Sequence, residues 1–210
     1  MNIGIIGAGN VGAALGKHWA AAGYKVKLGV RDLNKPEVQR LLQTCGSNAS
    51  AAGVQEAAQF AEVVVVTTPF AATRAALESA GDLAGKVVVD CTNPVKPDLS
   101  GLIIGHETSA AEQVARWAKG ARVVKCFNTT GANNMDDPRY AEGKPVMFLC
   151  GDDAEAKRAV TQLSNEIGFE TIDAGQLEIA RLLEPLAMLW IHLAFRGGLG
   201  REFAFRLMRR

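Results

Sequence analysis

Residues 2–12 of the chain read Asn2-Ile3-Gly4-Ile5-Ile6-Gly7-Ala8-Gly9-Asn10-Val11-Gly12. The apolar, β-branched run from Ile3 to Ile6 predicts a buried parallel strand, and the alanine-rich segment from Val11 to Ala22 predicts a helix. Between them the glycines stand at the spacing G-x-G-x-x-G. That spacing between a strand and a helix is typical of a loop that binds the pyrophosphate of a dinucleotide. We therefore predict that the chain folds around a dinucleotide-binding turn.

Each glycine of this turn has its own physical role in the prediction. Gly7 permits the tight turn, and Gly12 lets the helix pack closely on the strand. Gly9 lets backbone N–H groups approach a pyrophosphate without a side chain in between. The backbone of Gly9, Asn10 and Val11, at the positive end of the helix dipole, is expected to hold that pyrophosphate.

The rest of the chain alternates strand patterns with helix patterns. Further strands are expected at residues 25–31, 63–66, 87–91, 122–127, 145–150 and 169–174. This alternation predicts an α/β fold, a Rossmann-like doubly wound parallel sheet with right-handed crossovers. Residues 1–130 are expected to form the dinucleotide-binding domain. Residues 131–210 are expected to form a small C-terminal β/α extension packed on the same sheet.

Two parts of that extension carry expectations of their own. Residues 132–144 are polar and irregular, as in a substrate lid. The block from Leu186 to Phe195 is apolar almost all round, so the terminal helix is expected to be buried, between layers or against a second subunit. His192 within it is expected to be a core residue.

The end of the second strand predicts which dinucleotide is bound. An acidic residue about 20 positions beyond the glycines binds the ribose 2′-hydroxyl of NAD, whereas an arginine accommodates the 2′-phosphate of NADP. Arg31 stands there, with Lys35 shortly after and Asp32 next to it. A guanidinium can pair a phosphate through two hydrogen bonds, so we predict NADP(H) as the cofactor.

Polar residues follow three of the strands at their carboxyl ends, where open α/β sheets bind ligands. Thr68, Pro69, Asn93 and Asn128 are the candidates for the nicotinamide side of the cofactor. Alternatively, Thr68 or Asn93 caps a helix. His106 lies in a loop near the expected cleft and is a candidate for contact with substrate.

Composition excludes several other classes of protein. The chain has 210 residues, is 48% hydrophobic and has a formal net charge of +1, which argues against nucleic acid or an anionic membrane as partner. Its four cysteines lack metal-ligand spacing, so we expect reduced thiols in a cytoplasmic protein and no metal site. The apolar run from Leu186 to Phe195 is too short to cross a bilayer.

Several longer motifs make the chain resemble the family of NADPH-dependent reductases of the deazaflavin coenzyme F420. These are residues 124–129 (Val-Lys-Cys-Phe-Asn-Thr), residues 151–157 (Gly-Asp-Asp-Ala-Glu-Ala-Lys), residues 173–175 (Asp-Ala-Gly) and residues 180–184 (Ala-Arg-Leu-Leu-Glu). The chain is similar also to the cytosolic domain of six-transmembrane metalloreductases. The resemblance implies hydride transfer between NADP(H) and the ring of coenzyme F420 or a flavin, in a protein that is usually a homodimer. The family usually carries Ser-Arg or Thr-Arg where this chain has Val30-Arg31.

No catalytic residue is assigned, because the two carriers themselves contain the chemistry of hydride transfer. The anionic tail of F420 would need basic side chains, and Arg139, Lys144, Arg196 and Arg201 are available. One alternative is an imine or short hydroxy-acid reductase. Such enzymes resemble the chain at the front but carry a further all-helical domain, for which too few residues follow Phe127. Another alternative is a redox sensor that binds NADP(H) without turnover.

Overall fold

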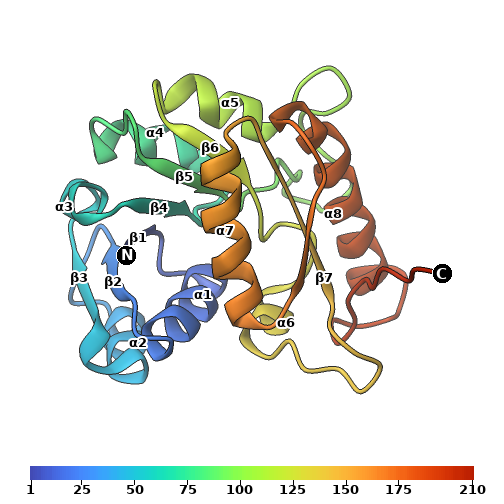
Figure 1. The fold of residues 1–210 in the computed structure, drawn as a ribbon, viewed down its shortest axis with the longest axis horizontal. Coiled ribbons are helices and arrows are strands. Elements are labelled where there is room, and N and C mark those ends of the chain that lie inside the picture. Colours follow the sequence, from blue (N-terminus) through green and yellow to red (C-terminus); the bar gives the residue numbers. More distant parts are fainter.

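Eight strands form one sheet in the order β3-β2-β1-β4-β5-β6-β7-β8 in the computed structural model, which describes residues 1–210 (Figure 1). The strands are β1 (Asn2–Ile6), β2 (Lys25–Gly29), β3 (Ala49–Ala52), β4 (Val63–Val66), β5 (Val87–Asp90), β6 (Arg122–Lys125), β7 (Val146–Gly151) and β8 (Glu170–Asp173). The helices are α1 (Asn10–Ala21), α2 (Pro36–Cys45), α3 (Val54–Phe60), α4 (Phe70–Ala80), α5 (Ala110–Trp117), α6 (Ala132–Asp136), α7 (Ala154–Ile167) and α8 (Ala180–Phe195). Short 3₁₀ turns cover Gly46–Asn48 and Leu177–Ile179.

The two sides of the sheet carry separate hydrophobic cores, because successive residues of a strand point to opposite faces. In β4, Val63 and Val65 pack on the face covered by α1, α2, α6 and α7. Val64 and Val66 pack on the opposite face, under α3, α4, α5 and α8. The predicted α/β architecture with helices on both faces is therefore confirmed. All four cysteines lie buried in this structure as free thiols, as expected of small core residues.

The direction of the last two strands differs from the prediction of a wholly parallel sheet. Strands β1 to β6 are parallel, but β7 is antiparallel to β6, and β8 is parallel to β7. The connection from β6 to β7 contains only the five-residue helix α6, and this helix packs against α1. The chain therefore does not cross back along the sheet, and β7 begins at the rim where β6 ends.

Residues 132–144, predicted as a lid, divide into two parts. The first part is α6, in which Asn134 and Met135 are buried, and Asp136 pairs with Lys17 of α1. These residues belong to the packed fold. Most of the loop from 137 to 144 is exposed, and a lid function for it stays a prediction.

Helix α8 runs unbroken through Pro185, and only part of its surface is covered. Its buried side includes Leu183, Ala187 and Trp190. On the other side Leu182 is 66% exposed and Leu189 is 48% exposed. The alternative that this helix is buried between layers of one chain is therefore wrong, and burial against a second subunit stays a prediction. His192 is exposed as well, not in the core. No helix is both long enough and apolar enough to span a bilayer.

Candidate functional site

The turn between β1 and α1 has the geometry that its glycines predict. Gly7 has φ = +110°, a conformation that favours glycine. A Cβ on Gly12 would lie 2.2 Å from the carbonyl oxygen of Gly7, so only glycine allows this approach of helix to turn. A Cβ on Gly9 would meet nothing within 4 Å, which leaves its backbone open to a ligand. Thr67, directly after β4, braces the turn by donating from Oγ1 to the Gly7 carbonyl oxygen at 2.9 Å.

A cleft of about 480 Å³ lies beside this turn. Six of the predicted site residues line it: Gly7, Gly9, Arg31, Lys35, Thr68 and Pro69. Asn10, Val11 and Gly12 form the adjoining first turn of α1. Asn93 and Asn128 do not line this cleft, and lie instead beyond the ends of β5 and β6.

The cations of the cleft have no partner in the protein. Neither Arg31 nor Lys35 makes a hydrogen bond or ion pair through its side chain. The carboxylate of Asp32 is already engaged, because it accepts a hydrogen bond from the Asn34 backbone N–H at 2.9 Å. The loop therefore presents two positive charges to the cleft, and its acidic residue stabilises the backbone of the loop. This arrangement fits a phosphate better than a ribose hydroxyl pair.

Asn93 and Asn128 are hydrogen-bonded to each other. Asn93 donates from Nδ2 to the carbonyl oxygen of Asn128 at 2.9 Å, and Asn128 donates from Nδ2 to Oδ1 of Asn93 at 3.1 Å. Phe127, just before this pair, adopts φ = +58°, which is rare for a bulky residue and is common at functional sites. The aromatic ring of Trp19 packs edge-on against it, with ring centroids 5.7 Å apart.

The alternative role of Thr68 and Asn93 as helix caps is wrong. Helix α4 begins at Phe70 without a side-chain cap, and the Thr68 hydroxyl is instead hydrogen-bonded to that of Thr73 at 2.9 Å. No helix begins directly after Asn93, which leads into the irregular segment before α5.

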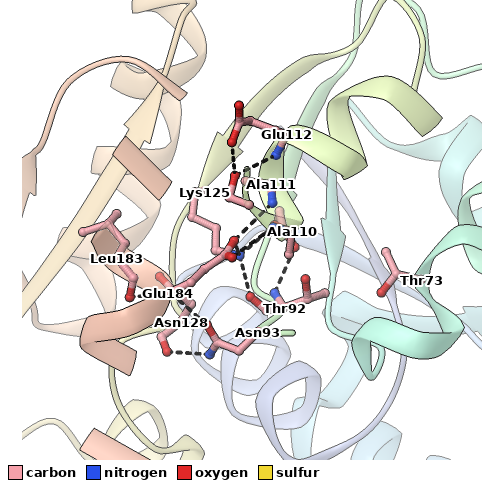
Figure 2. Close-up of polar contacts among 12 residues, drawn as sticks. Thr73, Thr92, Asn93, Ala110, Ala111, Glu112, Lys125, Asn128, Leu183 and Glu184 are labelled. Carbon is pink, nitrogen blue, oxygen red and sulfur yellow. Dashed lines mark hydrogen bonds and ion pairs between the residues drawn. The ribbon is translucent and has the colours of Figure 1, made fainter. Parts of the chain in front are cut away.

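A fully buried ion cluster, not predicted from the sequence, lies on the α5 and α8 side of the sheet (Figure 2). Lys125 Nζ lies 2.8 Å from Oδ2 of Asp90 and 2.9 Å from Oε1 of Glu184, and all three side chains are 0% exposed. Asp90 and Lys125 are register partners on neighbouring strands. Glu184 also accepts hydrogen bonds from the backbone N–H groups of Ala110 and Ala111, the first residues of α5.

Burial and charge act in opposite directions on the pKa values of this cluster. Burial alone would lower the pKa of Lys125, but the charges of Asp90 and Glu184 outweigh it and raise that pKa above its ordinary value. Burial raises the pKa of Glu184, and the charge of Lys125 opposes this. A signal for the cluster was present in the sequence, since Asp90 and Lys125 interrupt otherwise apolar strands.

None of the four basic residues considered for an anionic tail lines the cleft. Arg139 pairs with Asp137, and Arg196 donates to the carbonyl oxygen of Asp98 at 2.8 Å. Arg201 lies over the ring of Phe195, and Lys144 borders a separate open hollow at the edge of β8. His106 borders a third hollow, between its own loop and α8.

Comparison with known proteins gives concordant results from sequence and from structure. Residues 2–94 match the family model described as NADP oxidoreductase coenzyme F420-dependent. The F420-dependent NADP reductase of Methanothermobacter thermautotrophicus is 32% identical over 213 residues, covering 93% of this chain and 90% of that protein. The solved structure of a putative F420-dependent NADP reductase from Arthrobacter sp. FB24 has a TM-score of 0.89 and 35% identity, with 99% of both chains covered.

Two further relatives share less with the chain. Metalloreductase STEAP3 of Rattus norvegicus is 32% identical over 193 residues, but the chain spans only 37% of its length. The imine reductase of Streptomyces aurantiacus has a TM-score of 0.69 at 20% identity, with 94% of this chain and 64% of that chain covered. This likeness is one of fold alone. It extends well beyond the front of the chain, in contrast to the predicted resemblance at the front only.

Two glycine substitutions are expected to have different effects at the turn. Gly12→Ala should lower the free energy of unfolding by about 1–3 kcal/mol, because its Cβ has no room beside the Gly7 carbonyl. Gly9→Ala should leave stability unchanged and weaken dinucleotide binding, because its methyl group would stand where the phosphates approach. Denaturant titration and calorimetry with NADPH measure the two effects. Gly101→Ala is the control, since its Cβ too would meet nothing within 4 Å. Wild-type affinity in Gly9→Ala would contradict phosphate binding at this turn.

Proposed function

This chain belongs to the family of coenzyme F420-dependent NADP oxidoreductases, and from this premise we propose that it transfers a hydride between NADP(H) and the ring of coenzyme F420 or a flavin. The observation that carries the proposal is similarity to an F420-dependent NADP reductase over 90% of that enzyme's length. The unobstructed backbone at Gly9 and the unpaired cations Arg31 and Lys35 fit the pyrophosphate and the 2′-phosphate of NADP(H).

The strand order supports a specific placement of the cofactor. Ligands of doubly wound sheets bind where the order of strands reverses, which here lies between β1 and β4. The adenosine half would then lie over β2 with Arg31 and Lys35, and the pyrophosphate would cross at Gly9 to Val11. The nicotinamide would extend past Thr68 and Pro69 over β5 and β6. Asn93 and Asn128 are at the ends of those strands, which supports their assignment to the nicotinamide side.

The bound carriers supply the redox chemistry, so the protein's part is to hold them in position. A hydride passes directly only when donor and acceptor carbons lie at near-attack distance, in a cleft that excludes water. No acid or base of the chain is needed for that step, and we assign no catalytic residue.

Activity assays separate this proposal from its two alternatives. We expect the purified protein to oxidise NADPH rapidly when coenzyme F420, FMN or FAD is supplied under anaerobic conditions. Turnover with cyclic imines or short keto acids alone would favour the second class of reductase. Tight binding of NADPH with no turnover of any acceptor would indicate a redox sensor. The rank order of the first three compounds identifies the acceptor class.

Arg31→Ala tests the choice of dinucleotide. We expect the affinity for NADPH to fall by about 1–3 kcal/mol, as for other charge-assisted hydrogen bonds, and the affinity for NADH to change little. Calorimetric titration with both dinucleotides measures this difference. Arg158→Ala is the matched control, because Arg158 is an exposed arginine of α7 away from the cleft. An equal loss of affinity for both dinucleotides would show that Arg31 does not bind the 2′-phosphate.

We also propose that the protein is a cytoplasmic homodimer that pairs through the outer side of α8. The exposed apolar residues Leu182, Leu189 and Phe195 lie on this helix. Ile103, in the segment between β5 and α5 that borders a hollow together with α8, is 54% exposed. Exposed apolar residues on the outer side of a helix are typical of a subunit interface. Burial of α8 by a second copy would explain why the helix is apolar on nearly every side.

Leu189→Asp should convert the dimer to a monomer, because a carboxylate would be desolvated in the interface. Size-exclusion chromatography with light scattering measures the mass directly. Leu33→Asp provides the matched control, since Leu33 is 43% exposed in the loop after β2 and should not affect assembly. A monomeric wild-type protein would exclude the dimer.

A further inference from the structure

One buried lysine connects the elements that carry the Asn93–Asn128 pair. Lys125 donates a hydrogen bond to the carbonyl oxygen of Thr92, the residue immediately before Asn93. It also binds Asp90, whose other carboxylate oxygen accepts from the Thr92 backbone N–H at 2.9 Å. Both backbone polar groups of Thr92 are therefore held by the cluster, and the position of Asn93 follows from them.

The same cluster reaches Asn128 through α8. Lys125 binds Glu184, and the carbonyl oxygen of the neighbouring Leu183 accepts a hydrogen bond from Asn128 Nδ2 at 3.3 Å. Figure 2 shows the result, a closed ring of contacts that runs from Lys125 through Thr92 and Asn93 to Asn128 and returns through Glu184. Movement at any member of this ring would shift the asparagine pair.

Two polar atoms on this ring lack partners. Oγ1 of Thr92 and Oδ1 of Asn128 are buried without a hydrogen bond, and both residues are only 4% exposed. Buried polar groups in native proteins nearly always have a partner, so unpaired acceptors call for an explanation. Both can accept a hydrogen bond, and a carboxamide NH₂ group, such as that of nicotinamide, is a donor.

Stability alone does not explain a buried cluster of this kind. It combines one cation with two carboxylates, and a well-packed hydrophobic group of similar volume is often as stabilising as a buried ion pair. The charges in addition fix the positions of neighbouring elements. The ammonium group holds one oxygen atom each from β5, from the loop after β5 and from α8 at hydrogen-bond distance.

We propose that Lys125 is a positioning residue for the nicotinamide site proposed beyond the ends of β5 and β6. It fixes the Asn93–Asn128 pair, and with it the unpaired Oδ1 of Asn128, so that the ring of NADP(H) is held in one orientation for hydride transfer. The inference rests on the proposed function for the identity of the ring. It assigns to Lys125 no contact with the cofactor, and its effect passes through Thr92 and Glu184.

The test measures the affinity for NADPH, the fluorescence of its bound dihydronicotinamide ring and the rate of hydride transfer. Lys125→Met removes the ammonium group, and Asp90→Asn/Lys125→Met removes one carboxylate with it, so that fewer buried charges are left unpaired. Calorimetry with NADPH reports affinity, the fluorescence of the dihydronicotinamide reports the surroundings of the ring, and stopped-flow absorbance with F420 reports hydride transfer. Circular dichroism identifies the variants that are folded.

In folded variants we expect nearly unchanged affinity, because the phosphate contacts lie on the other half of the sheet. The emission of bound NADPH should shift toward that of the free cofactor. The rate of hydride transfer should fall about 10- to 100-fold, as expected for a small misplacement of the reacting carbon. Asn93→Ala should show the same pattern without disturbing a buried charge. Lys157→Met is the control, since Lys157 pairs with Asp173 on α7 and β8 and should behave as wild type.

Wild-type emission and wild-type rate in a folded lysine variant would overturn the inference. So would wild-type behaviour of Asn93→Ala, even if neither lysine variant folds. Failure of the proposed function has a different signature, in which the wild-type protein itself does not reduce F420. In that case the emission and affinity of the variants still decide whether Lys125 positions the ring.

Discussion

The structure depends on the close contact between the first helix and the turn that precedes it. Because Gly12 has no side chain, α1 approaches the carbonyl oxygen of Gly7 at a distance that any Cβ would forbid. This contact aims the amino end of α1 at the space above the sheet, and Thr67 ties the same turn to the end of β4. The place where the strand order reverses is thereby held rigid, as the proposed phosphate site requires. The rest of the sheet extends from it in both directions.

The basic residues in the two halves of the sheet have opposite surroundings. On the β2 side, Arg31 and Lys35 are left unpaired at the mouth of an open cleft, where they can exchange water for a phosphate. On the β5 and β6 side, Lys125 is completely enclosed and fully engaged with oxygen atoms. The first arrangement suits binding of a mobile anion. The second suits the fixing of neutral side chains such as those of Asn93 and Asn128.

Sequence patterns within short segments were enough to predict the glycine-rich turn and the cleft beside it. The remaining features depend on contacts between residues that are distant in sequence. The conformations of Gly7 and Gly12 and the place of Arg31 at the cleft could be predicted, because each depends on residues within a short segment. The sequence marks Asp90 and Lys125 as charges in apolar strands, but the cluster as a whole could not be predicted. Glu184 is 59 positions beyond Lys125, and its approach depends on how α8 packs. The reversal of β7 was missed for a similar reason, since a strand pattern does not record direction. The exposed side of α8 was missed because apolar residues give no periodic signal when nearly all are apolar.

The burial of all four cysteines determines how this protein responds to thiol reagents. Burial raises the pKa of Cys150 to about 12, and it raises the pKa of Cys91 as well. The thiolate is the reactive form of cysteine, so the folded protein offers almost none to an alkylating or oxidising agent. Modification therefore requires local unfolding that exposes the thiol. The labelling rate of these cysteines measures how often the helices on each face of the sheet separate from it. Since Cys126 belongs to the core under α1 and Cys150 to the core under α8, the chain carries a built-in probe for each of its two layers.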